Sequence, residues 1–167
     1  MFTKILVPLD GSKEAEKALG YVREVASKQD TRVCLLRVVQ VPMTFGEYPI
    51  SQEMLDSEMA AAEAYLERMG GQLASEGYQV EHATRLCDAV SGILDVAERE
   101  SSDLIVMTSH GRTGMGRFLM GSVAERLCRY ALCPLMIVGR ASLKARPVSR
   151  KPETSQPRVE PMSVALL

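Results

Sequence analysis

The segment Asp103-Leu104-Ile105-Val106-Met107-Thr108 is the stretch of the sequence that decides the fold class. Its four central residues are all apolar, with no alternation between apolar and polar side chains. A strand of this kind must be covered on both faces, which is typical of mostly parallel sheets with helices packed on each side. The segment therefore predicts an α/β protein in which the sheet lies between two layers of helices.

Strand-like and helix-like segments alternate on both sides of this stretch. Ser12 and Asp88 directly precede two of the helical segments and are typical N-cap residues. We expect strands at residues 4–9, 32–41, 79–86, 103–108 and 134–138, and helices at residues 13–27, 52–76, 89–100 and 122–131. The alternation predicts a five-stranded, mostly parallel, doubly wound (Rossmann-like) sheet with two helices on each face, which is an α/β/α sandwich.

The sequence changes character after Arg140. Half of the eight prolines lie in residues 141–167, where five basic residues face two acidic ones. Evenly spaced prolines and few large apolar residues are typical of a disordered, extended segment. We therefore expect one folded domain over residues 1–140 and a disordered tail over residues 141–167. The tail is either a solvated extension or a partner-binding segment that uses the final residues, Val164-Ala165-Leu166-Leu167.

The overall composition argues against several classes of protein. The formal net charge is -1, so the chain lacks the basic excess that is typical of nucleic-acid binding. No apolar run approaches the roughly 18 residues that a membrane span needs, and the start lacks the pattern of a signal peptide. The cysteines show no metal-binding spacing, and we expect them to be reduced; they are Cys34, Cys87, Cys128 and Cys133. We therefore expect a cytoplasmic protein that binds neither nucleic acid nor a membrane and that holds no metal through its own side chains.

A glycine-rich segment, residues 109–121, joins the expected strand 103–108 to the expected helix 122–131. Glycines allow backbone N–H groups to approach a charged group closely, and the N-terminus of a helix favours an anion. Arg112 and Arg117 add positive charge. The combination predicts a phosphate-binding site, although the segment is neither a Walker A loop nor a G-x-G-x-x-G motif. The alternative is a loop whose glycines serve only its turns.

Two motifs carry a resemblance to a known family. Ser109-His110-Gly111 is followed by nine residues and then by Gly121-Ser122, and residues 7–12 are Val-Pro-Leu-Asp-Gly-Ser. These patterns are similar to the phosphate motif and to the first strand and turn of the universal stress protein family. The resemblance spans roughly residues 1 to 140, with every element in order. Thr108 departs from the pattern, because the family has its first motif glycine there, and this side chain either crowds a ligand or offers it a hydroxyl.

The resemblance implies an ATP-binding site, with or without Mg²⁺, at the ends of the strands. Pro8, Leu9 and Val38 would line the adenine pocket, and Met107 would flank the nucleoside. Asp10 would contact the ribose or a phosphate-side group. Gly111, Gly121, Ser122 and Val123 would hold the phosphates through backbone N–H groups and hydroxyls. The further residues expected to contact the nucleotide are Thr108, Ser109, His110 and Arg112.

Simpler structural roles stay open for several of these residues. Asp10 precedes Gly11 and is typical of an Asx turn. Ser122-Val123-Ala124-Glu125 matches the S-x-x-E capping box, so the hydroxyl of Ser122 either contacts a phosphate or caps its own helix. Val38 and Met107 are either pocket residues or plain core.

The resemblance implies an ATP-binding stress-response regulatory module, in which nucleotide occupancy alters conformation or partner binding. His110 has no carboxylate beside it in the sequence, and the motif spacing yields no set of nucleophile, base and orienting group. We therefore assign no catalytic residue and expect at most weak ATP hydrolysis. Two alternatives stay open. One is a slow ATPase or a phosphate- or adenylate-transferring enzyme, and the other is an interaction protein that has lost nucleotide binding.

The last expected strand, residues 134–138, predicts a homodimer. A final strand of a doubly wound sheet often lies at an edge, where unpaired N–H and C=O groups invite pairing with a second chain. Pro134 opens the strand, where a missing N–H costs least, and no charged residue interrupts the apolar stretch. The resemblance implies the same assembly, because many members of the family dimerise through this strand. The alternative is that the tail folds back over the edge.

Overall fold

The computed structural model describes residues 2–40, 51–109 and 120–139. Three of the predicted site residues, His110, Gly111 and Arg112, lie outside the described residues, and so does the tail of residues 141–167. What the sequence predicts for them stays a prediction. In the described ranges, no helix is both long enough and apolar enough to cross a membrane.

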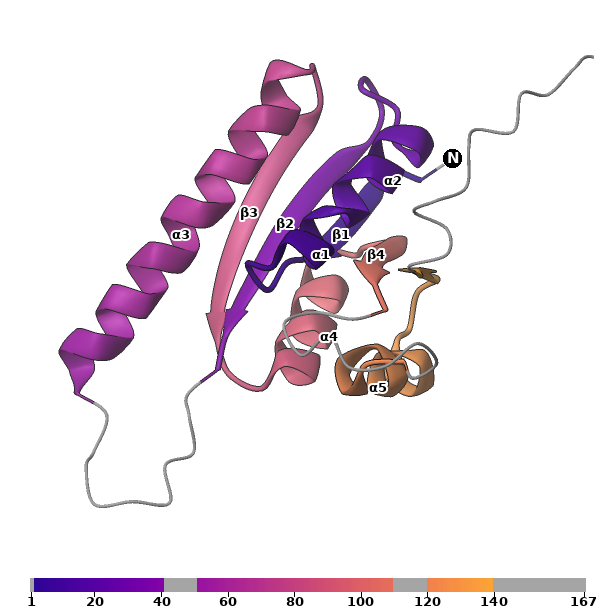
Figure 1. Ribbon diagram of the computed structural model, residues 1–167. Coiled ribbons are helices and arrows are strands. Elements are labelled where there is room, and N and C mark those ends of the chain that lie inside the picture. Colours follow the sequence, from indigo (N-terminus) through magenta and orange to yellow (C-terminus); the bar gives the residue numbers. More distant parts are fainter. Residues whose placement is uncertain (1, 41–50, 110–119, 140–167) are drawn as a thin grey trace, which may run out of the picture.

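All five predicted strands are present, and they form a single parallel sheet (Figure 1). They are β1 (Lys4–Pro8), β2 (Arg32–Val39), β3 (Gln79–Leu86), β4 (Leu104–Thr108) and β5 (Leu135–Val138). Their spatial order is β3-β2-β1-β4-β5, and every pairing is parallel. The predicted fold class is confirmed, and β4, whose apolar residues predicted it, is buried along its whole length.

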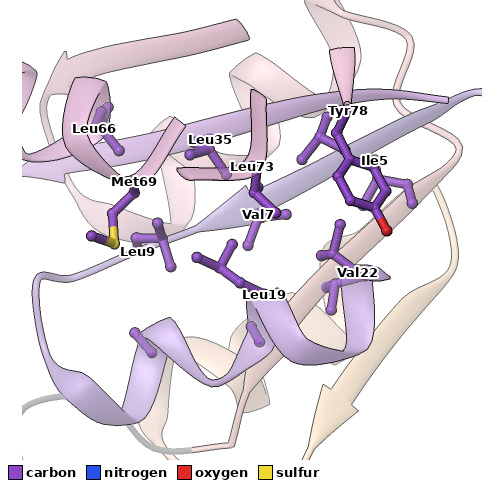
Figure 2. Close-up of a cluster of buried hydrophobic side chains, with 14 of the residues drawn as sticks. Ile5, Val7, Leu9, Leu19, Val22, Leu35, Leu66, Met69, Leu73 and Tyr78 are labelled. Carbon is purple, nitrogen blue, oxygen red and sulfur yellow. The ribbon is translucent and has the colours of Figure 1, made fainter. Parts of the chain in front are cut away.

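Helices cover both faces of the sheet. One face carries α1 (Lys13–Glu16), α2 (Ala18–Val25) and α3 (Gln52–Ser75), and the other carries α4 (Ala89–Arg99) and α5 (Ser122–Tyr130). Figure 2 shows the core of the first face, where side chains of α2 and α3 pack on those of β1 and β2. The labelled residues include Leu19, Val22, Leu66, Leu73, Val7 and Leu35. Each fully buried side chain of this size stabilises the fold by about 1.5–3 kcal/mol.

The helix predicted at residues 13–27 is wrong in one respect, because it is broken at Lys17. The Lys17 amide donates to the carbonyl of Glu14, three residues earlier (3.2 Å), which is a tighter turn than that of an α-helix. Residues three apart align on such a turn, and Ala15 and Ala18 are both buried, at 5% and 0% exposure. The apolar spacing fits a continuous helix equally well, so the sequence pattern did not reveal the break.

The N-caps predicted at Ser12 and Asp88 are confirmed. The Ser12 hydroxyl accepts a hydrogen bond from the Ala15 amide (3.1 Å), and the Asp88 carboxylate accepts one from the Ser91 amide (3.0 Å). The other predicted element ends differ from the observed ones by one or two residues, which is the usual uncertainty at element ends.

β1 lies where the strand order changes direction. From β1 the chain adds β2 and β3 on one side, and it then returns through α4 to place β4 and β5 on the other side. The pairing of β1 with β2 extends to Pro8↔Leu36, whereas its pairing with β4 ends at Leu6↔Ile105. The carboxyl ends of β1 and β4 are therefore not paired with each other, and open α/β sheets bind their ligands at such a crevice.

Candidate functional site

A pocket of about 120 Å³ opens at this crevice. Its walls come from the ends of β1, β2 and β4 and from the first turns of α1, α4 and α5. The structure brings seven of the predicted site residues together around it, namely Pro8, Leu9, Asp10, Val38, Met107, Thr108 and Val123. Residues as far apart in the sequence as Pro8 and Val123 thus line one pocket, as expected from a sheet whose strands all end at the same edge.

Asp10 is held at the pocket in an Asx turn. One of its carboxylate oxygens, Oδ1, accepts hydrogen bonds from the amide (2.9 Å) and the hydroxyl (2.6 Å) of Ser12. Gly11 has a φ of 83°, a conformation that glycine adopts without strain. The simpler structural role is therefore real, and the same carboxylate also lines the pocket. The turn fixes the orientation of Asp10 before any ligand arrives.

Val38 and Met107 form part of an apolar wall. Both belong to the hydrophobic core on the α4–α5 face, and Met107 is only 9% exposed. They are core residues and pocket residues at once, because the pocket is an opening in that core and Leu36 and Ile93 continue its lining. An apolar opening with a few polar groups at its rim is the usual form of a small-molecule site.

Thr108 ends β4, and its side chain is buried in the pocket wall at 7% exposure. It aligns with Val138 of β5, and the amide of the next residue, Ser109, donates to the Val138 carbonyl (3.0 Å). The departure from the family's glycine therefore places a β-branched side chain with a hydroxyl directly against the pocket.

Helix α5 begins without a side-chain cap. Its N-cap is Gly121, which accepts the first helical hydrogen bond from the Glu125 amide (2.9 Å), and Ser122 is the first helical residue. The capping-box alternative for Ser122 is therefore wrong, because the helix begins one residue earlier than that motif requires. Among the described residues, no side chain caps this helix end, and uncapped N–H groups at a helix N-terminus attract an anion.

The two ends of the glycine-rich segment lie against each other. The Gly121 amide donates to the Ser109 carbonyl (2.8 Å), and Ser109 is in turn bonded to β5. Ser109, Gly121 and Ser122 are thus gathered at the α5 N-terminus, one residue from Val123 of the pocket. His110, Gly111 and Arg112 belong to the segment between these ends.

Sequence reasoning missed four residues of the pocket, namely Ala15, Leu36, Ala89 and Ile93. Ala89 and Ile93 lie one turn apart at the start of α4, and Leu36 precedes Val38 by two positions on β2, so each pair shares a face. The periodicity of the sequence contains this signal. It does not show which strand ends the start of α4 would face.

Helix α4 approaches the pocket closely because Gly92 has no side chain. A Cβ at this position would lie 2.8 Å from Cys87 Sγ and 3.0 Å from a methyl group of Val38. The start of α4 is also tied to α5, since the Asp88 carboxylate lies 3.3 Å from the Arg126 guanidinium. Hydrogen bonds from Ser91 and from Arg126 hold the pKa of Asp88 below its ordinary value.

Metal and thiol chemistry are not evident around the pocket. In residues 2–40, 51–109 and 120–139, no three His, Cys, Asp or Glu side chains are grouped so that they could hold a metal ion. All four cysteines are free thiols, and burial raises the pKa of Cys34 to about 11. The thiol of Cys34 is therefore unreactive at neutral pH.

Comparisons with known proteins support the resemblance found in the sequence. The sequence model of the universal stress protein family matches residues 1–139. The chain belongs to this family. The universal stress protein MJ0531 of Methanocaldococcus jannaschii is 32% identical over 145 residues, which cover 83% of this chain and 82% of that protein.

Solved structures of universal stress proteins share the fold. MJ0577 of the same organism has a TM-score of 0.72 and 27% identity, over 84% of this chain and 97% of that chain. Two more distant structures contain nucleotides. A universal stress protein in complex with cAMP has a TM-score of 0.62 and 19% identity, over 82% of this chain and 97% of that chain. A family protein of Arabidopsis thaliana with AMP bound has a TM-score of 0.58 and 18% identity, over 87% of this chain and 97% of that chain.

Proposed function

We propose that the pocket binds an adenine nucleotide, with ATP as the expected ligand, and that its occupancy modulates conformation or partner binding in a stress response. The observation that carries the proposal is an apolar pocket at the switch point of the sheet beside a helix N-terminus without a side-chain cap. The complexes of universal stress proteins with cAMP and with AMP support the choice of an adenine nucleotide.

The chemistry of the lining suits the three parts of such a ligand. Leu36, Val38 and Met107 offer apolar contact to the base, and the carboxylate of Asp10 can accept hydrogen bonds from ribose hydroxyls. The phosphates would lie toward the start of α5, where N–H groups and the helix dipole favour negative charge. Mg²⁺, if present, would come with the phosphates, because the described side chains form no metal site of their own.

ATP hydrolysis is expected to be weak at most. Asp10 is the one titratable residue that lines the described part of the pocket, and its carboxylate already accepts two hydrogen bonds from Ser12. A slow ATPase or a phosphate- or adenylate-transferring enzyme is the alternative if turnover is found. The buried side chain of Thr108 favours a further alternative, an interaction protein that no longer binds nucleotide.

Calorimetric titration of the purified protein with ATP, AMP and cAMP tests the proposal. We expect saturable binding of at least one of them, with a rise in melting temperature that follows ligand concentration. GTP serves as the control for base selectivity. The absence of both heat and thermal shift with all three adenine nucleotides at millimolar concentration would contradict the proposal.

We propose further that two chains pair through β5. This strand lies at one edge of the sheet and is paired only with β4 among the described strands. Leu135, Met136 and Ile137 are half-buried, and Leu132, just before the strand, is 90% exposed. A second chain pairing along this edge would bury that apolar surface.

We also propose a cytoplasmic location, because the cysteines are free thiols and thiols persist in that compartment.

A further inference from the structure

Arg37 is a cation inside the sheet. It lies on β2, between β1 and β3, and it follows Val33 and Leu35 on the same face, both with 0% exposure. Arg37 is half-buried where the apolar pattern of the strand would place another aliphatic residue. A charge in such a position is costly unless hydrogen bonds compensate it. Its presence therefore calls for a functional or structural partner.

The partner is the turn that forms one wall of the pocket. The Nη1 of Arg37 donates to the carbonyl oxygen of Leu9 (3.3 Å), and the Leu9 amide donates to the Leu36 carbonyl (2.8 Å). Leu9 is thus held through both of its backbone polar groups, and it directly precedes Asp10. A side chain on the α3 face of the sheet therefore contacts the segment that presents Asp10 to the pocket on the opposite face.

A second cavity, of about 190 Å³, provides room for the guanidinium behind this turn. On the α3 side it is lined by residues at helical spacing, namely Glu58, Ala61, Ala62 and Tyr65, and it is completed by Gly11 and Arg37. Farther along α3, the buried positions are occupied by the large apolar residues Leu66, Met69 and Leu73. Beside the turn, the α3 surface therefore presents two small alanines flanked by Glu58 and Tyr65, and the cavity between them leaves room for Arg37 to reach Leu9.

Tyr65 secures the other end of the same segment. Its hydroxyl lies 3.5 Å from Oε1 of Glu16, the last residue of α1. Burial, followed by the charge of Glu16, raises the pKa of Tyr65 to about 12, so the hydroxyl stays protonated and is able to donate. The chain from Leu9 to Glu16 is thus held at both ends from the α3 side.

We propose that Arg37 is a positioning residue for the nucleotide pocket, because it fixes from the opposite face of the sheet the turn that carries Asp10. The inference rests on the proposed function for its consequence in binding. Its structural part, the order of the turn, holds for the ligand-free protein as well. Loss of the guanidinium would leave the fold in place and let the turn at residues 9–12 move.

Amide hydrogen exchange in the ligand-free protein tests the structural part. In Arg37→Met, which keeps the aliphatic stem, the amides of Gly11 and Ser12 are expected to exchange about tenfold faster, as expected when about 1.4 kcal/mol of hydrogen bonding is lost. The matched control is Arg32→Met on the same strand, which removes a surface ion pair with Glu81 (3.3 Å) at the other end of the sheet. Wild-type exchange of the turn in Arg37→Met would overturn the inference.

Nucleotide titration of the same variants tests the consequence. We expect Arg37→Met to lower the affinity for ATP about tenfold, Arg37→Lys to recover part of it, and Arg32→Met to bind as the wild type does. Faster exchange of the turn with unchanged affinity would overturn the positioning role. If the wild type binds no adenine nucleotide, the proposed function fails, and the exchange measurement still decides whether Arg37 orders the turn. Arg37→Gln replaces Arg37→Met should the latter not fold.

Discussion

Gly121 connects helix α5 to Ser109, the residue that follows β4. It caps the helix without a side chain, and its amide is bonded to Ser109. We expect Gly121→Val to weaken ATP binding more than tenfold, or by over about 1.4 kcal/mol, because a branched side chain would block the approach of phosphate to the first-turn amides. Calorimetry measures the effect. Gly71→Val on α3, where a Cβ meets nothing within 4 Å, is the control. Equal ATP affinities in the two variants would contradict phosphate binding at the start of α5.

Gly92 sets the distance between α4 and the apolar wall of the pocket. Its Cβ would meet Cys87 Sγ at 2.8 Å and Val38 at 3.0 Å, so Gly92→Ala must push the helix outward. We expect a loss of about 1–3 kcal/mol in the free energy of unfolding, as for other overpacked positions. Urea denaturation measures it. Gly71→Ala should instead be neutral or stabilising by up to about 1 kcal/mol, and a Gly92→Ala protein as stable as Gly71→Ala would contradict the close packing.

At the scale of elements, β5 offers a test of the proposed assembly. The Pro134 carbonyl accepts from Ile105 of β4, and the Val138 carbonyl accepts from Ser109, which directly follows β4. By alternation the backbone groups of Leu135 and Ile137 therefore point to the open edge. Val138 is in the core at 3% exposure, which makes it a poor site for a disruptive change. We expect Ile137→Pro to remove an outward N–H, to leave the β4–β5 ladder intact, and to convert a dimer into a monomer.

Light scattering at micromolar concentration distinguishes these states. Met136→Pro is the matched control, since its amide lies on the β4 side by the same alternation and its loss should destabilise the fold itself. A wild-type monomer at that concentration, or a dimer that survives Ile137→Pro, would refute pairing through this strand.

Most of the fold was predictable from the sequence at the scale of elements. Uninterrupted apolar runs such as residues 104–107 indicated buried parallel strands, and Ser12 and Asp88 marked helix starts, because both signals are local. The break at Lys17 was not predictable, since the apolar spacing of a tight turn also fits a continuous helix. The start of α5 at Ser122 was predicted, but the S-x-x-E pattern left open whether Ser122 caps this helix. Tertiary packing of Ala15 and Ala18 decided the first case.

The site was predictable only in part, because its walls depend on which elements meet. The resemblance to the family implied seven of the lining residues. Ala89 and Ile93 of α4 reach the pocket only because the chain crosses back to place β4 beside β1, and no local sequence pattern specifies this crossing. Arg37 and Tyr65 were missed for the same reason, since they act from the face opposite the pocket.

For the whole molecule, the carboxylates predict how stability depends on pH. Burial raises the pKa of Asp103, but hydrogen bonds from Thr3 and Lys4 outweigh it and hold the pKa below its ordinary value. Hydrogen bonds donated by Arg or Ser lower the pKa of Glu76, Asp88 and Asp95 as well. A lowered pKa contributes stability above the ordinary value, and this contribution is lost as pH falls through the folded-state pKa. We therefore expect stability to fall below about pH 4.

At alkaline pH a raised pKa limits stability, in contrast to the lowered pKa values of the carboxylates. Burial raises the pKa of Cys34 from 9.0 to about 11, so this thiol contributes stability below pH 9 that is lost as pH rises toward 11. Urea unfolding from pH 3 to 11 should give a plateau of stability between these limits.

Asp103→Asn tests the acid limit. The variant is expected to be less stable than the wild type at pH 7 and to lose less stability as the pH falls. Asp56→Asn, on the exposed side of α3, serves as the control. An acid limb unchanged by Asp103→Asn would contradict this role.

Hydrolysis is also a property of the whole molecule. We expect the purified protein to turn over ATP more slowly than about 1 per second, the low end of ordinary enzymes, since the described pocket positions no activator for a water molecule. Phosphate release measured with and without Mg²⁺ provides the test. A faster rate that disappears in Gly121→Val would establish an ATPase at this site.

The central place of β1 has a consequence for the way the protein is made. β1 is the first of the described strands, yet it pairs with β4, and the residues just before the two strands, Thr3 and Asp103, are hydrogen-bonded although they are 100 residues apart. At a synthesis rate of about 5–20 residues per second, the nascent chain holds one side of its middle strand open for roughly 5–20 seconds. β2 and β3 emerge in that interval, so β1–β3 with α1–α3 can assemble on the ribosome as a half-sheet with one unpaired edge. We infer that the chain is most exposed to misassembly, and to chaperone binding, before residue 104 has left the ribosome.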